Sequence, residues 1–449
     1  MSSRVSLVLW MTLLASCGGA TAESSSAHRD PAVPPSSPQA DAASGRPLTA
    51  REIQKIEPLV HAAEEIRNLR FAQPVPMQVQ SAAAIRASMA SELEDEDLLE
   101  NRNFYVALGL LDPSLDVREL LLDVLGEQVV GYYDTKRHRL TLREDVMSQS
   151  FSFGSGRQVS MESPAMVIVH ELVHALQDQA LGLSAAEEVD RSDDAGNAFH
   201  AVVEGDATLA MVGHLMSRNG VPLFMLAGQV NTLRQLMSQQ PQQAAPGSEA
   251  LMHAPAIVRV PLMSAYIDGM LFCTTVYGQR GGWTAVDQAH REPPASTEQI
   301  LHPEKYLVGE RPDAIAIPPL TALESAGYRT LQDDTVGELE MSVYFALGTN
   351  DERNTEAAMG WGGDRVRVVQ SRNGTLGAVW FTSWDTEPEA VEAENAARAI
   401  FTRQAIAAIP HRELRVGRAL LMTRNIDDAS ANTEIESAFR AFAASLPAR

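Results

Sequence analysis

The segment Pro164–Gly182 constrains the fold more than any other part of the chain, because it is apolar on nearly all sides and yet contains charged groups. Ser163 before Pro164 is typical of a helix start, and Gly182 is typical of the residue that ends a helix. A helix that is apolar all round is buried inside a protein. The histidines and acids of its central stretch, VIVHELVHALQD, are therefore expected to be buried, where they need partners.

Two histidines of this stretch are spaced as metal ligands. His170 and His174 are one helical turn apart, so their imidazoles project from one face and could bind the same ion. Glu171 lies beside the first ligand, where it could hold a water molecule in an open metal position. A bound Zn²⁺ lowers the pKa of that water to roughly 7, and the carboxylate accepts its proton. The HExxH spacing thus predicts zinc as the cofactor and Glu171 as the general base; the alternative is a buried helix whose histidines bond to backbone.

A catalytic zinc ion usually has three protein ligands, so one more is expected elsewhere. The best candidate is Glu204 in VVEGDA, which lies 30 residues after His174, enough for a loop and an antiparallel helix. Gly205 and Ala207 are small and would let this second helix approach the first closely. His200, one turn before Glu204, is either an alternative ligand or, as we favour, a residue that orients one.

The stretch HELVHALQD resembles the active-site helix of gluzincin metallopeptidases, the thermolysin-like group with two histidine ligands and a downstream glutamate. The match extends to Ala175 and Asp178, and Glu204-Gly-Asp-Ala is similar to the third-ligand helix of gluzincin-like envelope proteins. The resemblance covers about residues 164–211. It implies zinc binding by the two histidines and Glu204, proton transfer by Glu171, and orientation of a ligating imidazole by Asp178.

The sequence also departs from that family. Thermolysin-like enzymes have an acid four residues after the third ligand, where this chain has Thr208; Asp206 lies two residues after it and is expected to support the site. No motif identifies the residue that would stabilise the oxyanion. We favour His302, in the polar segment PPASTEQILHPEKY, over four other candidates: Tyr266, Tyr277, Arg280 and Tyr306.

The N-terminus predicts export. Residues 1–17 contain one early arginine, an apolar run too short to span a bilayer, and Leu-Ala-Ser-Cys, which resembles the lipobox of bacterial lipoproteins. We expect Cys17 to be the lipidated first residue of the mature protein, although a plain secretory signal is the alternative. Residues 18–48, rich in Ala, Ser and Pro, are expected to be a disordered tether. Because no acid follows Cys17 directly, we expect an outer-membrane anchor in the bacterial cell envelope.

Composition excludes two other classes. A formal net charge of -22 argues against binding to nucleic acid and against electrostatic docking on anionic lipid. Cys273 is the second of two cysteines, so lipidation of Cys17 would leave no disulfide.

The pattern of apolar residues predicts an α+β fold. A zincin-like, mainly helical domain with a small β-sheet is expected over residues 49–310, and an α+β accessory domain over 311–449, beyond the proline-rich GERPDAIAIPP. The segments expected to form elements are helices over 49–69, 81–111, 115–125, 164–182, 193–217, 336–348 and 387–406, a hairpin of Val129–Tyr133 and Arg139–Leu142, and strands over 364–370 and 376–384.

These expectations combine into a zinc-dependent peptidase that is anchored to the membrane through Cys17, acts on a peptide or protein substrate and does not bind nucleic acid. Two alternatives remain open. One is a non-catalytic, zinc-stabilised envelope lipoprotein with a binding or assembly role. The other is a hydrolase of non-peptide amides.

Overall fold

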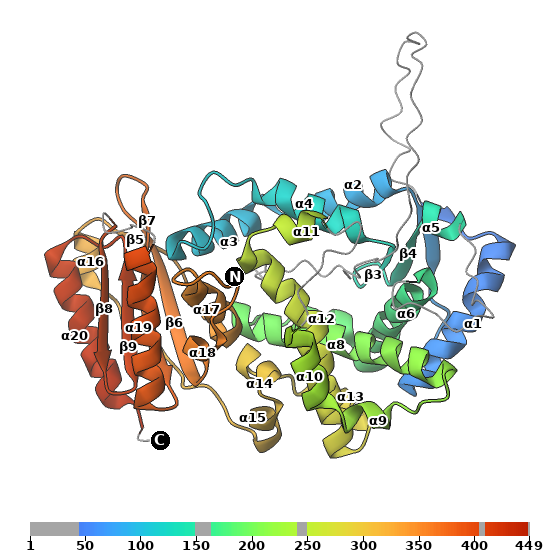
Figure 1. Cartoon of the computed structure of the whole chain (residues 1–449). Helices are drawn as coiled ribbons and strands as arrows, with labels where there is room; N and C mark the ends of the chain where they lie inside the picture. Colours follow the sequence, from blue (N-terminus) through green and yellow to red (C-terminus); the bar gives the residue numbers. More distant parts are fainter. Residues whose placement is uncertain (1–44, 149–162, 240–248, 404–408, 448–449) are drawn as a thin grey trace, which may run out of the picture.

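The computed structural model describes residues 45–148, 163–239, 249–403 and 409–447, and shows an α+β protein with many helices and two small sheets (Figure 1). The predicted signal peptide, Cys17 and most of the predicted tether lie outside the described residues. The C-terminal sheet lies on the left in Figure 1 and the N-terminal sheet on the right, with long helices between them. Helices α6 (Pro164–Leu181) and α8 (Asp193–Arg218), which carry the candidate ligands, pack against each other.

The first sheet has the strand order β1-β2-β4-β3. Strands β2 and β4 are parallel, and the outer pairs are antiparallel. Arg46 and Pro47 were predicted to belong to the disordered tether. In the structure they form strand β1, because they pair with β2. Among the described residues, β3 is an edge strand, with a neighbouring strand on one side only. The bounds are β1 Arg46–Pro47, β2 Met77–Gln80, β3 Gly131–Asp134 and β4 Arg139–Arg143.

The helices that precede α6 in the sequence surround this sheet and extend toward the C-terminal half. Helix α1 begins with the capping box predicted at Thr49. The single helix predicted over 81–111 is in fact two helices, because Leu93 is extended and buried and a run of acids then begins a new helix, whose N-terminal dipole favours negative charge. The bounds are α1 Ala50–Arg67, α2 Ala82–Glu92, α3 Asp95–Leu108, α4 Val117–Gln128 and α5 Glu144–Ser148.

Helices α6 and α8 are the two that the sequence predicts to bind metal. Helix α6 is buried from Ala165 to Gln177, and Gly182 ends it in the left-handed conformation. Helix α12 is long and apolar enough to cross a membrane, but most of it is buried inside the protein, where it packs along α8. The bounds in this part are α6 Pro164–Leu181, α7 Leu183–Glu187, α8 Asp193–Arg218, α9 Phe224–Ala227, α10 Val230–Gln239, α11 Glu249–His253, α12 Ala256–Arg280, α13 Trp283–Arg291, α14 Thr297–Leu301 and α15 Pro303–Val308.

The second sheet is antiparallel throughout, with the order β5-β6-β7-β9-β8. Its residues alternate between two cores: Trp380 faces α17 and α19, whereas Phe381 packs on α20. The predicted turn after Gln370 joins β6 to β7. The bounds are α16 Thr321–Ser325, β5 Arg329–Asp334, α17 Gly337–Ala346, α18 Thr355–Ala358, β6 Trp361–Gln370, β7 Leu376–Trp384, α19 Glu387–Arg403, β8 His411–Val416, β9 Ala419–Arg424 and α20 Ala429–Ser445.

Candidate metal centre

Helices α6 and α8 bring together the side chains of His170, His174 and Glu204. One nitrogen or oxygen atom from each residue lies within 4.8 Å of the other two. The two histidine Nε2 atoms are 3.0 Å apart, and Glu204 Oε2 is 3.0 Å from that of His170 and 3.5 Å from that of His174. Two imidazole nitrogens and one carboxylate oxygen form the donor set typical of a catalytic zinc site. The three residues therefore fit a single zinc ion.

The site is deeply buried, and its charges are balanced within it. His170 and Glu171 have no exposed surface, and Glu204 is 2% exposed. Burial alone would raise the pKa of the Glu204 carboxyl, but the positive charge of His174 and hydrogen bonds from the histidines outweigh it and lower that pKa well below its ordinary value. Glu204 is thus held as a carboxylate, which is the form that binds a metal.

His200 also contacts Glu204, on the side away from the other histidines. Its Nε2 atom is 3.3 Å from Glu204 Oε1, one helical turn along α8. The three clustered donor atoms do not include a His200 nitrogen. The structure therefore places His200 where it orients the carboxylate of Glu204.

Glu171 points to the edge strand β3. The backbone N–H of Tyr133 donates a hydrogen bond of 2.9 Å to Glu171 Oε2. The Tyr133 hydroxyl donates a second bond, of 2.6 Å, to Asp178 Oδ2. Because Glu171 and Asp178 are two turns apart on α6, these two bonds fix the strand along the helix that carries the candidate general base.

Gln177 was not predicted to belong to the site, yet it supports a ligand directly. Its Oε1 atom lies 2.8 Å from His174 Nδ1, which keeps a proton on Nδ1, so that Nε2 is the nitrogen that can lose its proton and bind a metal. Its Nε2 donates to Asp206 Oδ2 and to the backbone oxygen of Val203. This contact could have been predicted from the sequence, since Gln177 follows His174 by three residues and therefore shares its helix face.

Asp206 is the centre of a buried ionic network behind Gln177. Arg67 Nε donates to Asp206 Oδ1 at 2.7 Å, and His290 Nε2 lies 2.9 Å from Oδ2. Arg67 also bonds Asp287 and lies over the Trp283 ring, 4.6 Å from its centroid. Asp206 therefore reaches the metal ligands through Gln177, and it connects them to helix α1.

The small residues of α8 serve two different neighbours. A Cβ atom on Gly205 would lie 2.2 Å from the backbone of Gly269, so the close approach is to α12 and not to α6. Ala207, in contrast, packs in the apolar cluster that contains Ile168 and Leu172 of α6. The prediction for Ala207 agrees with the structure, and the prediction for Gly205 named the wrong partner.

Asp178 takes part in a different contact from the one that the resemblance implies. Its carboxylate bonds the Tyr133 hydroxyl, His138 Nδ1 and Ser184, rather than a ligating imidazole. Asp178 thus ties the β3–β4 hairpin and the start of α7 to the end of α6. The orienting role expected of it is filled by Gln177.

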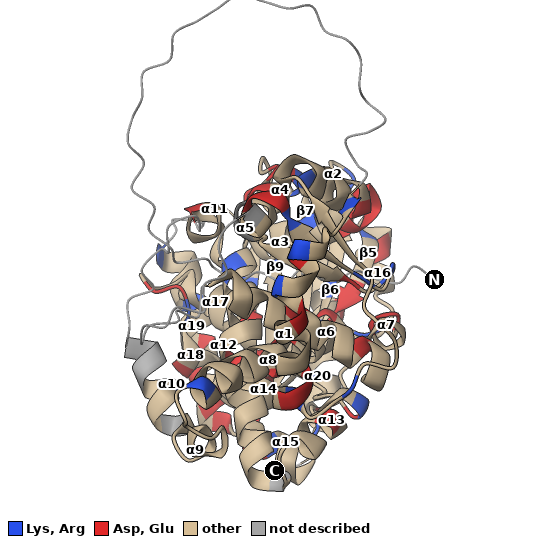
Figure 2. Cartoon of the chain, turned by 90° about the vertical axis from the view of Figure 1, so that its right-hand side faces the viewer, with Lys and Arg blue, Asp and Glu red and all other residues tan. Residues whose placement is uncertain are grey.

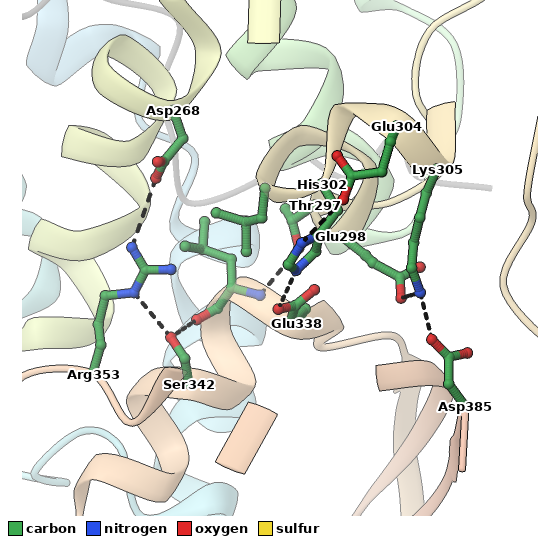
Figure 3. A network of polar contacts seen from close by, with 12 residues as sticks. Asp268, Thr297, Glu298, His302, Glu304, Lys305, Glu338, Ser342, Arg353 and Asp385 are labelled. Carbon is green, nitrogen blue, oxygen red and sulfur yellow. Dashed lines mark hydrogen bonds and ion pairs between the residues drawn. The ribbon is translucent and has the colours of Figure 1, made fainter. Parts of the chain in front are cut away.

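His302, which we favoured for the oxyanion, lies in another network. Its Nε2 atom is 2.9 Å from Glu338 Oε1, and its Nδ1 faces Glu304 (Figure 3). Tyr266 is the candidate that lies against the ligands, with its ring stacked on His170 at 6.0 Å between centroids. Tyr277 packs on Trp283. Of the remaining candidates, the Tyr306 hydroxyl donates to the backbone of Glu292, and the side chain of Arg280 lies outside the described residues.

A family model described as a domain of unknown function (DUF8575) matches residues 326–441, from the start of the second sheet to α20. No curated protein and no solved structure matches the chain. The matched residues lie outside helices α6 and α8, so the comparisons do not bear on the candidate metal centre.

Proposed function

We propose that this protein is a zinc-dependent peptidase. The observation that carries the proposal is the convergence of His170, His174 and Glu204 on one point. Glu171 follows His170 directly on helix α6. The zincin-like description of the fold, which rests on the resemblance of α6 to the gluzincin helix, is part of this proposal. Zinc, when bound, supplies a Lewis acid that acidifies a water molecule and polarises a carbonyl.

We assign the other steps of peptide hydrolysis to residues of the chain itself. Glu171 accepts the proton of the attacking water and passes it to the leaving amine. An extended peptide would add to the edge of strand β3, where it would replace Glu171 as the partner of the Tyr133 N–H. Tyr266 replaces His302 as our candidate for stabilising the oxyanion, because it lies beside the ligand His170.

The proposed location is the bacterial cell envelope, with the chain anchored by a lipid on Cys17, in the outer membrane. The supporting observation is the sequence of residues 1–17, which combines an export signal with a lipobox-like cysteine. The substrate would accordingly be a peptide or protein within reach of that anchor.

A second function is favoured by the burial of the site. His174 is the most exposed of the three ligands, at 4%. Catalytic zinc sites keep an open position, whereas structural sites are closed. A zinc-stabilised lipoprotein with a binding role would use the same ligands without hydrolysis.

The chain from Gly18 onward should be purified, its zinc content measured, and its hydrolysis of unfolded proteins tested against the variant Glu171→Gln. We expect about one zinc per chain. The variant should keep its zinc and lose hydrolysis by at least about a hundredfold, because the amide cannot accept the proton. The matched control is Glu188→Gln, an exposed glutamate, which should behave as wild type.

The outcomes separate the two functions. Hydrolysis that survives Glu171→Gln with zinc bound would disprove the proposed mechanism. A wild-type chain that cleaves no protein or peptide, yet melts at a lower temperature after chelation, would establish the structural role of zinc instead.

A further inference from the structure

The first turn of α8 is bonded to the C-terminal domain that the family model matches. The backbone N–H of Asp193 donates to Asp334 Oδ1 at 3.1 Å, and Asn197 Nδ2 donates to Glu340 Oε1 at 3.0 Å. The hydroxyl of Tyr105 donates to the same Glu340 oxygen at 2.9 Å. All five residues are buried. Helix α8 therefore begins inside a polar contact with β5 and α17.

A second group of contacts joins α8 to α17 through α14. Thr297 donates to Asp194 Oδ1 through its backbone N–H, at 2.9 Å, and through its hydroxyl, at 2.5 Å. The same hydroxyl accepts the backbone N–H of Leu339 (Figure 3). Gly337, at a φ of 75°, lies so close that a Cβ atom there would be 1.8 Å from Asp194 Oδ1. No side chain fits at this position of α17.

These contacts lie in line with the metal ligand on α8. Asn197 precedes Glu204 by seven residues, which is two turns of helix, so both side chains project from the same face about 10 Å apart. A rotation or slide of α8 at Asn197 would turn Glu204 away from the two histidines of α6. Because Glu204 Oε2 must stay near both Nε2 atoms, the rotation of α8 sets the geometry of the centre.

We propose that the C-terminal domain fixes the rotation of α8, with Glu340 as the positioning residue that holds Asn197 and thereby keeps Glu204 on the metal. This assigns a role to the domain of unknown function. It rests on the zinc centre of the proposed function but not on peptidase activity. At the far side of Glu204, Asp206 and Gly205 hold the same helix against α1 and α12, so the ligand lies between two points of attachment.

The test compares three variants of the same helix, α17, in the chain from Gly18 onward. Glu340→Ala removes the acceptor for Asn197, whereas Glu340→Gln retains an acceptor oxygen. The matched control is Glu338→Ala, because Glu338 is equally buried on α17 but bonds His302 instead of α8 (Figure 3). The measurements are the zinc dissociation constant, by competition with a chelator, the visible spectrum of the cobalt-substituted protein, and the melting temperature.

We expect Glu340→Ala to weaken zinc binding by about tenfold or more and to alter the cobalt spectrum, since indirect supports of a metal site affect affinity to this extent. Glu340→Gln should restore both. Glu338→Ala should lower the melting temperature without changing zinc affinity. Equal affinities for wild type and Glu340→Ala, or equal losses in both alanine variants, would overturn the inference. Tight zinc binding without hydrolysis would contradict only the peptidase, and a wild type that binds no zinc would overturn both.

Discussion

Helix α8 contacts buried acids in opposite ways at its first turn and around its middle. Around the middle, Glu204 and Asp206 face histidines and Arg67, and these positive charges outweigh burial and lower both carboxyl pKa values. At the first turn and its contact with α17, burial raises the pKa values of Asp194 and Glu340 well above their ordinary range. The hydrogen-bond partners of these two acids are uncharged groups of Thr297, Tyr105 and Asn197.

The two pairs of acids are suited to different roles, one to binding a cation and the other to holding elements together. A carboxyl that stays ionised inside the protein can bind a cation, as Glu204 is placed to do. Asp194 and Glu340, whose pKa values burial raises, are instead held by hydrogen bonds from uncharged groups, without a counter-charge. One helix therefore combines what we call its ionic half, the turns around Glu204 and Asp206, with what we call its neutral half, the first turn and its contacts with the C-terminal domain. Figure 2 shows that acidic residues occur on many other elements of the chain.

The largest effect, on the free energy of unfolding, is expected from removing Arg67 of α1, the cation that faces Asp206 in the ionic half. Arg67→Met leaves Asp206 buried without its main counter-charge, and losing one partner of a buried pair costs about 3–5 kcal/mol of unfolding free energy. Denaturant unfolding at neutral pH measures it. The control is Arg70→Met, since Arg70 is 71% exposed and its contact with Glu64 should be worth less than about 1 kcal/mol. Equal losses in the two variants would show that the ionic half is not held by charge balance.

A smaller effect, on zinc affinity, is expected at Gln177, which lies between Asp206 and the candidate ligand His174. Gln177→Leu removes the acceptor that fixes the His174 tautomer and also the link to Asp206, so zinc affinity should fall by about 10–100-fold. Competition with a chelator measures this affinity. Gln179→Leu is the matched control, because in the part of the chain that the structure describes this amide bonds the backbone of Gln73 and no group of the candidate site. Unchanged affinity in Gln177→Leu would mean that His174 is oriented by packing alone.

Much of the ionic half could be predicted from the sequence, because helical spacing determines which residues share a face. The one-turn separation of His170 and His174 and the position of Glu204 in an apolar helical segment follow from such spacing. The supporting residue Gln177 follows from the same rule, although the resemblance directed attention to Asp178 instead. The start of the β3–β4 hairpin at Gly131 was also close to the prediction.

The neutral half could not be predicted, since it depends on which elements meet. Spacing shows that Asn197 and Glu204 share a face, but not that Glu340, more than a hundred residues later, would approach it. The small size of Gly205 correctly predicted a close approach of α8 to another helix. The prediction named α6, whereas the structure shows α12. His302 was chosen for its position in a polar segment, and that segment faces α17. Sequence order determines none of these contacts between elements.

The smallest expected effect tests the neutral half through pH. The pKa of Glu340 is raised from 4.5 by burial and by the nearby Asp193, so between 4.5 and that higher value the folded chain binds more protons than the unfolded chain. Stability must then fall as pH rises through this interval. Glu340→Gln has no proton to lose and should show a weaker fall, by a few degrees of melting temperature, between about pH 5 and pH 8. If both proteins lose stability in parallel, Glu340 is ionised in the folded state, and the contrast between the two halves of α8 is then one of partners and not of charge.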